Sequence, residues 1–542
     1  MNFLKKYYIV ILLILLIVFH LICNVIWIIQ DQSPPLWDMA GHSERSIKIF
    51  ELLNPPSLAK LRIIGGYQNI YPPLVYAVTS IFYFIFGVKE DIPNFSNLVF
   101  VIILLLSTFG IGKKLYSDKI GLLSAFFISI YSLTVHFSRI YDLDYQLAAM
   151  VTLAIYLLLK TEYFSGRKYS VSLGIVIVFG LLTKWTFLFF VIGPILVIFW
   201  KAFVSKKIYQ YRIEKIKPLI NFIITLLITL VFSIPWYFKH YKLIFNIADQ
   251  ARNNVFSVPY ENLFSLNNLF YYFSRLHQSI YLIFFILFIL GLIYIILIKK
   301  YRNLSLLLWF FIPYIIMTFL FSKESRYFLP AYPMVAVSSA VFLATLKYKT
   351  LKSVLIIFFT VFGLYYFTET SWNIRLLSNV SFLKPILFSG YGYILPTSES
   401  PRYGYTYPIK FDSKIKDTID TIQQSKKDDK IIPKVAIIPN DIFFNSQQFV
   451  YYTALKKYKI DYSPSSKIRN QSYEQNLSEA DFIVTKTGFQ GPEIWAKYSK
   501  EITDMENNPE NQIFYKQYKL IKSMEREDGS TIKIYQKANG QI

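Results

Sequence analysis

The chain has 542 residues, of which 54% are hydrophobic and 18% aromatic, and it carries a formal net charge of +23. Apolar runs long enough to cross a bilayer recur from residue 7 to about residue 368, which excludes a soluble globular protein. Residues 369–542 hold 24 Lys and Arg against 20 Asp and Glu, so most of the positive charge lies in short loops between the apolar runs. That distribution is typical of a polytopic membrane protein and argues against nucleic-acid binding. The single cysteine, Cys23, excludes disulfides within the chain and cysteine-based metal sites.

The first apolar run, "YYIVILLILLIVFHLICNVIWII" at residues 7–29, predicts a membrane-spanning helix. It is too long for the apolar region of a signal peptide and lacks a cleavage site of small residues, so we expect it to be retained. The fold class that follows is a mainly α-helical polytopic membrane protein with about 11–13 transmembrane helices. Further spans are expected at 96–112, 119–137, 144–160, 170–183, 185–201, 218–236, 279–298, 303–321, 327–346 and 352–368.

Charge sets the expected orientation of these spans. With a cytoplasmic N-terminus, every basic loop falls on the cytoplasmic side of the membrane. The apolar segment "YPPLVYAVTSIFYFIFG" (71–87) threatens this scheme, because one more span would turn the downstream basic loops outward. We therefore interpret it as an interfacial or re-entrant helix inside a first outer loop at residues 30–95. The basic loops are 112–119, 160–168, 201–217, 299–303 and 347–352.

The sequence predicts two domains: a transmembrane domain at residues 1–368, and an extracytoplasmic mixed α/β domain at residues 369–542. In the second, "KVAIIP" (434–439) and "DFIVTK" (481–486) are typical of buried strands, and 444–459 has helical apolar spacing. Residues 515–537 alternate apolar and polar positions on both sides of Asp528-Gly529, which predicts a β-hairpin.

The stretch "SPPLWDMAGHSER" (33–45) places several polar residues directly after the first span. Asp38 is a candidate general base near a lipid-borne substrate; on spacing alone, an N-cap of the following amphipathic helix explains it better. His42 lies four residues further on and shares a helix face with Asp38. Two such ligands are too few to define a metal site, so metal binding stays open. Glu44 and Arg45 fit better as solvated helix charges.

Two further loops on the expected outer side carry charge. In "SRIYDLDYQLAAM" (138–150), Asp142 and Asp144 open a span; the helix dipole explains one aspartate more easily than two, and Arg139 could pair with either. In "FSKESRYFLPAYP" (321–333), Lys323 and Arg326 stand where the positive-inside rule disfavours cations, as does Lys184 in "GLLTKWTF". Such cations fit a phosphate at the membrane surface, or pairing with Glu324, Asp38 or Asp144.

These residues together suggest a reaction at the outer interface. The chain has no Walker loop, dinucleotide fingerprint, nucleophile elbow or zinc-protease motif. A substrate that carries its own leaving group and sits in the bilayer, a polyprenyl-phosphate-linked sugar, fits best. The cations would hold the departing phosphate while a carboxylate activates the acceptor hydroxyl.

The chain also resembles the GT-C class of integral-membrane glycosyltransferases, in the branch of the protein O-mannosyltransferases and the lipid A aminoarabinose transferase. The resemblance spans residues 1 to about 345 and rests on five motifs in register. They are "PPLWDMAGH", "YPPLVYAVTSIFYFIFG", "SRIYDLDYQLAAMVTLAIYLLL", "GLLTKWTF" and "KESRYFLPAYP".

The resemblance implies a GT-C fold, a polyprenyl-phosphate sugar donor and inverting transfer to a protein, lipid or glycan acceptor. It makes Asp38 and Asp144 the catalytic acids, and Asp38 then becomes a catalyst rather than a cap. The family often has Asp-Glu in the first loop, whereas Met39 follows Asp38 here, which leaves a divalent metal ion and the acceptor class open. It implies Lys184, Lys323 and Arg326 as donor phosphate ligands, with His42, Asp142, Arg139 and Tyr327 in support.

Three alternatives stand beside this hypothesis. One is an oligosaccharide ligase or polymerase that uses a diphosphate-linked carrier. Another, of a different class, is a polytopic transporter or flippase, although ionisable residues near mid-span are nearly absent. The third is a family member without activity that holds a partner enzyme. The sequence favours the polyprenyl-phosphate-dependent glycosyltransferase of the cell membrane, with its N-terminus in the cytoplasm.

Overall fold

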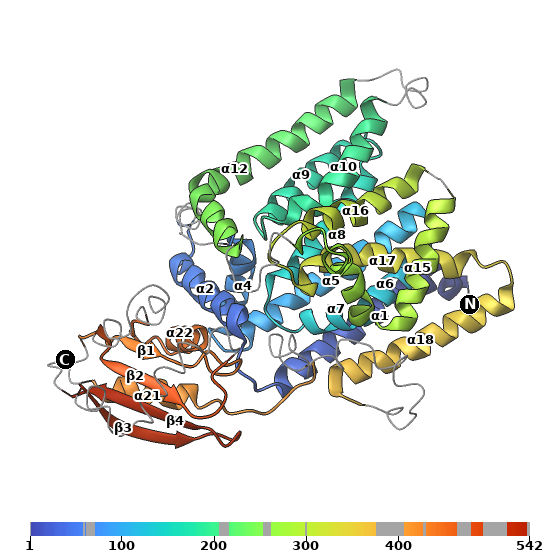
Figure 1. Cartoon of the computed structure of the whole chain (residues 1–542). Coiled ribbons are helices and arrows are strands. Elements are labelled where there is room, and N and C mark those ends of the chain that lie inside the picture. Colours follow the sequence, from blue (N-terminus) through green and yellow to red (C-terminus); the bar gives the residue numbers. More distant parts are fainter. Residues whose placement is uncertain are drawn as a thin grey trace. The chain divides into compact units, whose positions relative to one another are not determined.

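The computed structural model of the chain is shown in Figure 1. It divides into two compact units that interleave along the sequence. Unit 1 comprises residues 1–28, 52–79 and 94–395, and unit 2 comprises 29–51, 80–93 and 396–542. The structure describes residues 2–57, 60, 71–204, 216–252, 262–298, 301–374, 406–426, 430–462, 479–491 and 517–538.

Unit 1 is helical. Six helices among the described residues are long and apolar enough to cross a membrane: Tyr7–Gln30, Ile92–Leu115, Leu143–Lys160, Ile216–Asn246, Ser325–Thr345 and Lys349–Trp372. Four shorter apolar helices are Leu74–Phe86, Phe187–Phe203, Leu282–Leu297 and Asn303–Thr318. The mainly α-helical fold class is confirmed, and the number of crossings stays a prediction. Most of the basic loop 201–217 lies outside the described residues.

Most helices of unit 1 coincide with predicted spans, but α12 continues to Arg252, well beyond the predicted end at residue 236. Where the sequence predicts one span at 119–137, the structure has two helices, because Tyr131 between them takes an extended backbone conformation. The helices are α1 (Asn2–Gln30), α5 (Ile92–Leu115), α6 (Asp118–Ile130), α7 (Ser132–Phe137), α8 (Leu143–Lys160), α9 (Arg167–Leu181), α10 (Phe187–Phe203), α12 (Ile216–Arg252), α13 (Leu266–Leu269), α14 (Tyr271–Ile280), α15 (Leu282–Leu297), α16 (Tyr301–Thr318), the 3-10 helix η2 (Ser325–Ala331), α17 (Tyr332–Thr345) and α18 (Lys349–Trp372).

Helix α4 (Leu74–Phe86) occupies the ambiguous apolar segment 71–87. Its 13 residues extend about 20 Å at 1.5 Å per residue, less than the roughly 30 Å of a bilayer's hydrocarbon core. This length agrees with a helix that does not cross the membrane by itself. The interfacial or re-entrant placement stays a prediction.

Helix α8 lies at the centre of the packing that positions the site. It contacts α9, α10 and η2, while α17 packs on α6 and α15. Small residues allow close helix approach in such bundles. At the crossing of α5 and α6, a Cβ added to Gly112 would lie 2.7 Å from the Cα of Gly121. Backbone contact at this crossing therefore requires glycine.

Unit 2 joins part of the first loop to the C-terminal region. Helix α2 (Trp37–Leu53) begins after the turn "SPP", and the Trp37 indole donates to Asn440 Oδ1 at 3.0 Å. The Gln448 amide donates to the Pro35 carbonyl at 3.0 Å. Residues far apart in the sequence therefore hold the start of α2 in place. The predicted boundary at residue 368 stays a prediction.

The C-terminal part of unit 2 is a four-stranded sheet in the order β1-β2-β4-β3, with helices α21 (Ile415–Gln424) and α22 (Ser446–Leu455) (Figure 1). β1 (Val435–Ile437) pairs in parallel with β2 (Phe482–Lys486), which pairs antiparallel with β4 (Thr531–Lys537). β3 (Tyr518–Glu525) completes the predicted hairpin, whose Gly529 has a positive φ of 76°. The two strands, the helix and the hairpin predicted from the sequence are confirmed.

Candidate active site

Three loops of unit 1 converge on one buried cluster of charged side chains. The first precedes and opens α8, the second is the short turn between α9 and α10, and the third leads into η2. Each loop had been singled out in the sequence by its unusual charges. The cluster contains Asp142, Asp144, Lys184, Glu324 and Arg326.

The acidic pair belongs to the start of α8. Asp142 is the N-cap residue, and its side chain accepts the backbone N–H of Asp144 at 3.2 Å. Asp144 lies in the first turn, where the positive end of the helix dipole favours a carboxylate. Both residues are 1% exposed. The helix start thus accounts for where these carboxylates are placed.

The cations reach the carboxylates from the other two loops. Lys184 Nζ lies 2.6 Å from Asp144 Oδ1. Arg326 Nη1 donates to Asp142, and Arg326 Nε lies 2.6 Å from Glu324 Oε2 and 3.6 Å from Asp144 Oδ2. Three carboxylates therefore surround two cations, which confirms the pairing alternative for Arg326. Removing one member would leave a charge buried without compensation.

Aromatic rings border the cluster. The Tyr327 hydroxyl donates to Glu324 Oε1 at 3.2 Å, and its ring lies 5.0 Å from Lys184 Nζ. Tyr272 on α14 is 2% exposed. Burial, together with the neighbouring Tyr271 and the acids nearby, raises the pKa of Tyr272 well above its usual range. Sequence reasoning missed Tyr272, because one tyrosine among 43 carries no signal of its own.

Lys323 stands apart from this cluster. Its ammonium donates to the carbonyl of Met317 at 3.0 Å and to that of Thr318, at the C-terminal end of α16. Cations are favoured at this end of a helix. Burial lowers the pKa of Lys323 to about 8. Its predicted role toward a phosphate stays a prediction.

Arg139 does not pair with Asp142 or Asp144, so that part of the sequence interpretation is wrong. Its Nε donates to Asn24 Oδ1 at 2.9 Å and its Nη2 to Ser371 Oγ at 2.7 Å. The guanidinium also lies 5.7 Å from the Trp27 ring and 5.4 Å from the Phe367 ring. Aromatic faces and neutral acceptors compensate its charge, and it ties α1 and α18 to the loop before α8.

Asp38 and His42 lie in unit 2, on α2. Asp38 is exposed in the first turn of the helix, one residue after its start, whereas His42 is 3% exposed. Glu44 is buried and pairs with Lys48, so its interpretation as a solvated charge is wrong. The proximity of Asp38 to Asp144 stays a prediction. Among the described residues, no group of three His, Cys, Asp or Glu side chains is arranged to hold a metal ion.

Part of the chain that carries this cluster matches a known family model. Residues 71–237, which include Asp142, Asp144 and Lys184, match the model of the dolichyl-phosphate-mannose-protein mannosyltransferase family. The predicted resemblance to this family is confirmed over residues 71–237. The protein is an integral multi-pass membrane protein. An uncharacterized protein of Aquifex aeolicus (strain VF5) is 25% identical over 364 residues, 66% of this chain and 67% of that one.

Solved structures resemble the whole chain. ArnT from Cupriavidus metallidurans bound to undecaprenyl phosphate has a TM-score of 0.57 and 12% identity, with 96% of this chain and 97% of that chain covered. The oligosaccharyltransferase AglB from Archaeoglobus fulgidus has a TM-score of 0.52 and 13% identity, covering 99% and 75%. At these identities the likeness establishes the fold alone.

Proposed function

We propose that the protein transfers a sugar from a polyprenyl-phosphate donor to an acceptor hydroxyl, at the extracytoplasmic face of the cell membrane. The observation that carries this proposal is the buried cluster around Lys184 and Arg326, most of which lies in the segment that matches the mannosyltransferase family. The fold shared with ArnT, whose structure holds undecaprenyl phosphate, supports a lipid-phosphate donor.

The reaction is a single displacement at the anomeric carbon of the donor sugar. The acceptor oxygen forms a bond to this carbon as the bond to the phosphate oxygen breaks, so the configuration inverts. The electron pair of the broken bond stays on the polyprenyl phosphate, which gains one negative charge. The acceptor proton passes to a carboxylate. Asp38 is the proposed base, because it is an exposed acid in the first turn of α2.

Lys184 and Arg326 are the proposed partners of the leaving phosphate. Each is held by carboxylates, Lys184 by Asp144 and Arg326 by Asp142 and Glu324. Cations held in this way need little rearrangement when charge develops on the phosphate, which is how preorganised electrostatics lower a barrier. In this account Asp144 acts as a positioning residue that fixes the Lys184 ammonium.

Lys323 and Tyr327 are assigned supporting roles. Tyr327 donates to Glu324 and lies beside Lys184, so it restricts both partners of the cluster. The Lys323 ammonium donates to two carbonyls at the end of α16. If it exchanged one of these carbonyls for a phosphate oxygen, it would bind the donor. His42 and Arg139 are assigned to packing around the loops that carry the reacting groups.

Purified protein incubated with labelled polyprenyl-phosphate sugars tests this function. We expect release of polyprenyl monophosphate together with transfer of one sugar. The matched comparison is the same sugar on a polyprenyl diphosphate. Consumption of the diphosphate donor alone would favour the oligosaccharide ligase, and movement of intact donor between leaflets without cleavage would favour the flippase.

The extracytoplasmic placement of unit 2 has its own test. Cys23 is buried, so a variant with Cys23→Ser and Lys410→Cys carries one exposed thiol in unit 2. A membrane-impermeant maleimide added to intact cells should label this variant. Labelling only after the cells are lysed would place unit 2 in the cytoplasm.

A further inference from the structure

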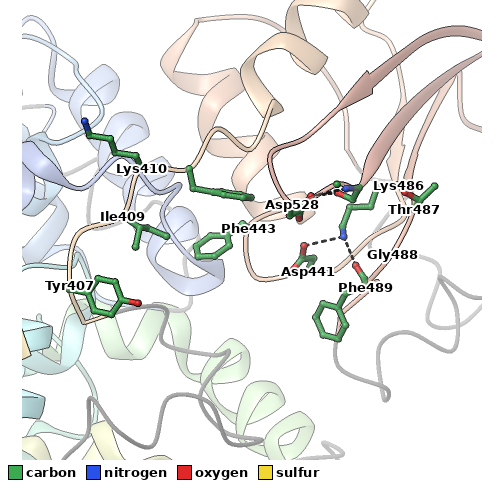
Figure 2. A pocket seen from close by; sticks show the side chains of 13 residues that line it. Tyr407, Ile409, Lys410, Asp441, Phe443, Lys486, Thr487, Gly488, Phe489 and Asp528 are labelled. Carbon is green, nitrogen blue, oxygen red and sulfur yellow. Dashed lines mark hydrogen bonds and ion pairs between the residues drawn. The ribbon is translucent and has the colours of Figure 1, made fainter. Parts of the chain in front are cut away.

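A cavity of about 790 Å³ opens in the C-terminal part of unit 2 (Figure 2). Four segments line it: residues 407–411, the loop at 441–443, the end of β2 with the following turn at 486–489, and the hairpin turn at 528–530. Its volume falls within the roughly 300–1,000 Å³ of small-molecule pockets. No step of the proposed transfer reaction uses these residues.

Charged groups form one side of this cavity. Lys486 Nζ lies 3.2 Å from Asp441 Oδ2 and donates to the Phe489 carbonyl, with its side chain 1% exposed. Arg526 Nη1 lies 3.2 Å from Asp528 Oδ2 and 3.7 Å from Asp441 Oδ2. Figure 2 shows the Asp441–Lys486 pair facing the cavity, whereas the Lys410 ammonium points away. Two acids therefore balance two bases, which disfavours a strongly charged ligand.

Arg526 has unused hydrogen-bonding capacity. It is 3% exposed, and its Nε and Nη2 have no hydrogen-bond partner among the described residues. Its guanidinium lies 5.1 Å from the centre of the Phe411 ring, which lines the cavity. A buried donor without a partner costs free energy. A ligand hydroxyl that accepted a hydrogen bond from the Arg526 guanidinium would offset part of this free-energy cost.

Aromatic rings also line the cavity, and Figure 2 shows Phe489 on the same side as Lys486 and Asp441. Phe411 and Phe443 have ring centres 5.1 Å apart, and Tyr407 and Phe489 also line the cavity. Phe489 is 56% exposed, although a phenyl ring of this size is usually covered. Flat rings together with both hydrogen-bond donors and acceptors fit a ligand with apolar C–H faces and a rim of hydroxyls. A neutral sugar ring has this chemistry.

We propose that this cavity binds a neutral saccharide. The ring faces of Phe443 and Phe489 would pack against sugar C–H groups, while Asp441 and Asp528 accept from hydroxyls and Lys486 donates to ring or hydroxyl oxygens. Asp441 follows Asn440, which accepts from Trp37 beside Asp38. A saccharide bound here therefore touches the segment that holds α2. The saccharide would be part of a glycan acceptor, and this assignment rests on the proposed function.

Binding of unlabelled oligosaccharides to the full-length protein in detergent, measured by calorimetry, tests the inference. The probes are maltoheptaose, a linear mannotetraose and chitotetraose, with inorganic phosphate and a sulfated tetrasaccharide as charged comparisons. We expect at least one neutral probe to bind. Because the binding experiment contains no sugar donor, its outcome does not depend on whether the protein is a transferase. A protein that bound a neutral probe but transferred no sugar would support the cavity proposal and contradict the proposed function.

The variants are Phe489→Ala and a matched control, Leu520→Ala, which removes another exposed apolar side chain, 46% exposed, on β3. Both positions are at the surface, so both variants should fold. We expect Phe489→Ala to weaken binding at least tenfold and Leu520→Ala to leave it unchanged. Binding of the charged probes alone, binding of no neutral probe, or equal affinities of wild type and Phe489→Ala would overturn the inference.

Discussion

The ammonium of Lys184 lies 2.6 Å from Asp144 Oδ1, although the two residues are 40 positions apart and belong to different loops of unit 1. Both are buried. A lysine and an aspartate removed from water together stabilise a fold only while both are present. The pair therefore links the architecture of the cluster to its proposed chemistry.

Breaking this pair should cost more than breaking an exposed one. Lys184→Met and Asp144→Asn should each lower the free energy of unfolding by about 3–5 kcal/mol, since each leaves a buried charge without its nearest partner. The double variant should lose much less than the sum of the two. Equilibrium unfolding in detergent micelles measures these changes.

Lys113→Met is the control for an exposed ion pair. Lys113 lies 3.2 Å from Asp118, and both side chains are about half exposed. This variant should lower the free energy of unfolding by less than about 1 kcal/mol. Strictly additive losses at Lys184 and Asp144 would refute the coupling.

Arg326→Lys tests geometry at constant charge. Arg326 uses Nη1 toward Asp142 and Nε toward Glu324, and a lysine has a single nitrogen that cannot serve both. We expect kcat to fall at least about tenfold, or about 1.4 kcal/mol in barrier height. Arg275→Lys is the control, since Arg275 donates to Gln278 outside the cluster. Turnover of Arg326→Lys equal to that of the wild type would show that charge alone matters there.

Trp37 and Asn440 should act as one unit in positioning α2. Trp37→Phe removes the indole donor and Asn440→Ala removes its acceptor, so each loses the same hydrogen bond. A bond of this kind contributes about 0.5–1.5 kcal/mol, which corresponds to a two- to tenfold loss of kcat if it aligns Asp38. The double variant should be no slower than either single one. Lys459→Ala, at an exposed position of unit 2, should behave as wild type. If the losses of kcat in the two single variants multiplied in the double variant, Trp37 and Asn440 would act independently.

Asp31 should make unit 2 less stable as the pH rises. Burial raises the pKa of Asp31 to about 6, despite hydrogen bonds from the Ile409 backbone and Ser33. The folded pKa lies above the unfolded value of about 4, so the contribution to stability is complete below pH 4 and is lost as the pH passes 6. The full effect is at most about 3 kcal/mol.

Asp31→Asn keeps an acceptor for the Ile409 amide and removes the charge. Amide hydrogen exchange of α22 in the full chain, corrected for the intrinsic rate at each pH, measures the stability of unit 2. The wild type should lose protection between pH 4.5 and pH 7, and the variant should lose less. Burial also raises the pKa of Asp91 to about 6, so Asp91 accounts for any pH dependence of protection that remains in the variant. Identical slopes in the two proteins would exclude Asp31 as the source.

Local patterns in the sequence were enough to predict most of the fold. Apolar length predicted most helices of unit 1, and the period-two alternation around Asp528-Gly529 predicted the hairpin. Positive-inside reasoning singled out Lys184 and Arg326 as cations that needed a partner, and the structure supplies carboxylates to both.

What the sequence could not predict depends on tertiary contacts. Arg139 is compensated by Asn24 and Ser371, neutral residues more than a hundred positions away, whose polarity gives no sign of that role. The joining of the first loop to the C-terminal region through Trp37 and Asn440 spans about four hundred positions. The cavity at Phe489 likewise needs four separate segments to come together, each of which is unremarkable alone.

The most direct measurement is the rate at which Asp38→Asn releases polyprenyl monophosphate from a donor that the wild type consumes. Asparagine has nearly the shape of aspartate but cannot take up the acceptor proton, so the variant should fold, insert and bind donor while turnover falls by about 10²–10⁴. Correct insertion is checked by maleimide labelling of Asp38→Asn combined with Cys23→Ser and Lys410→Cys. Release of lipid phosphate by Asp38→Asn at close to the wild-type rate would contradict the account.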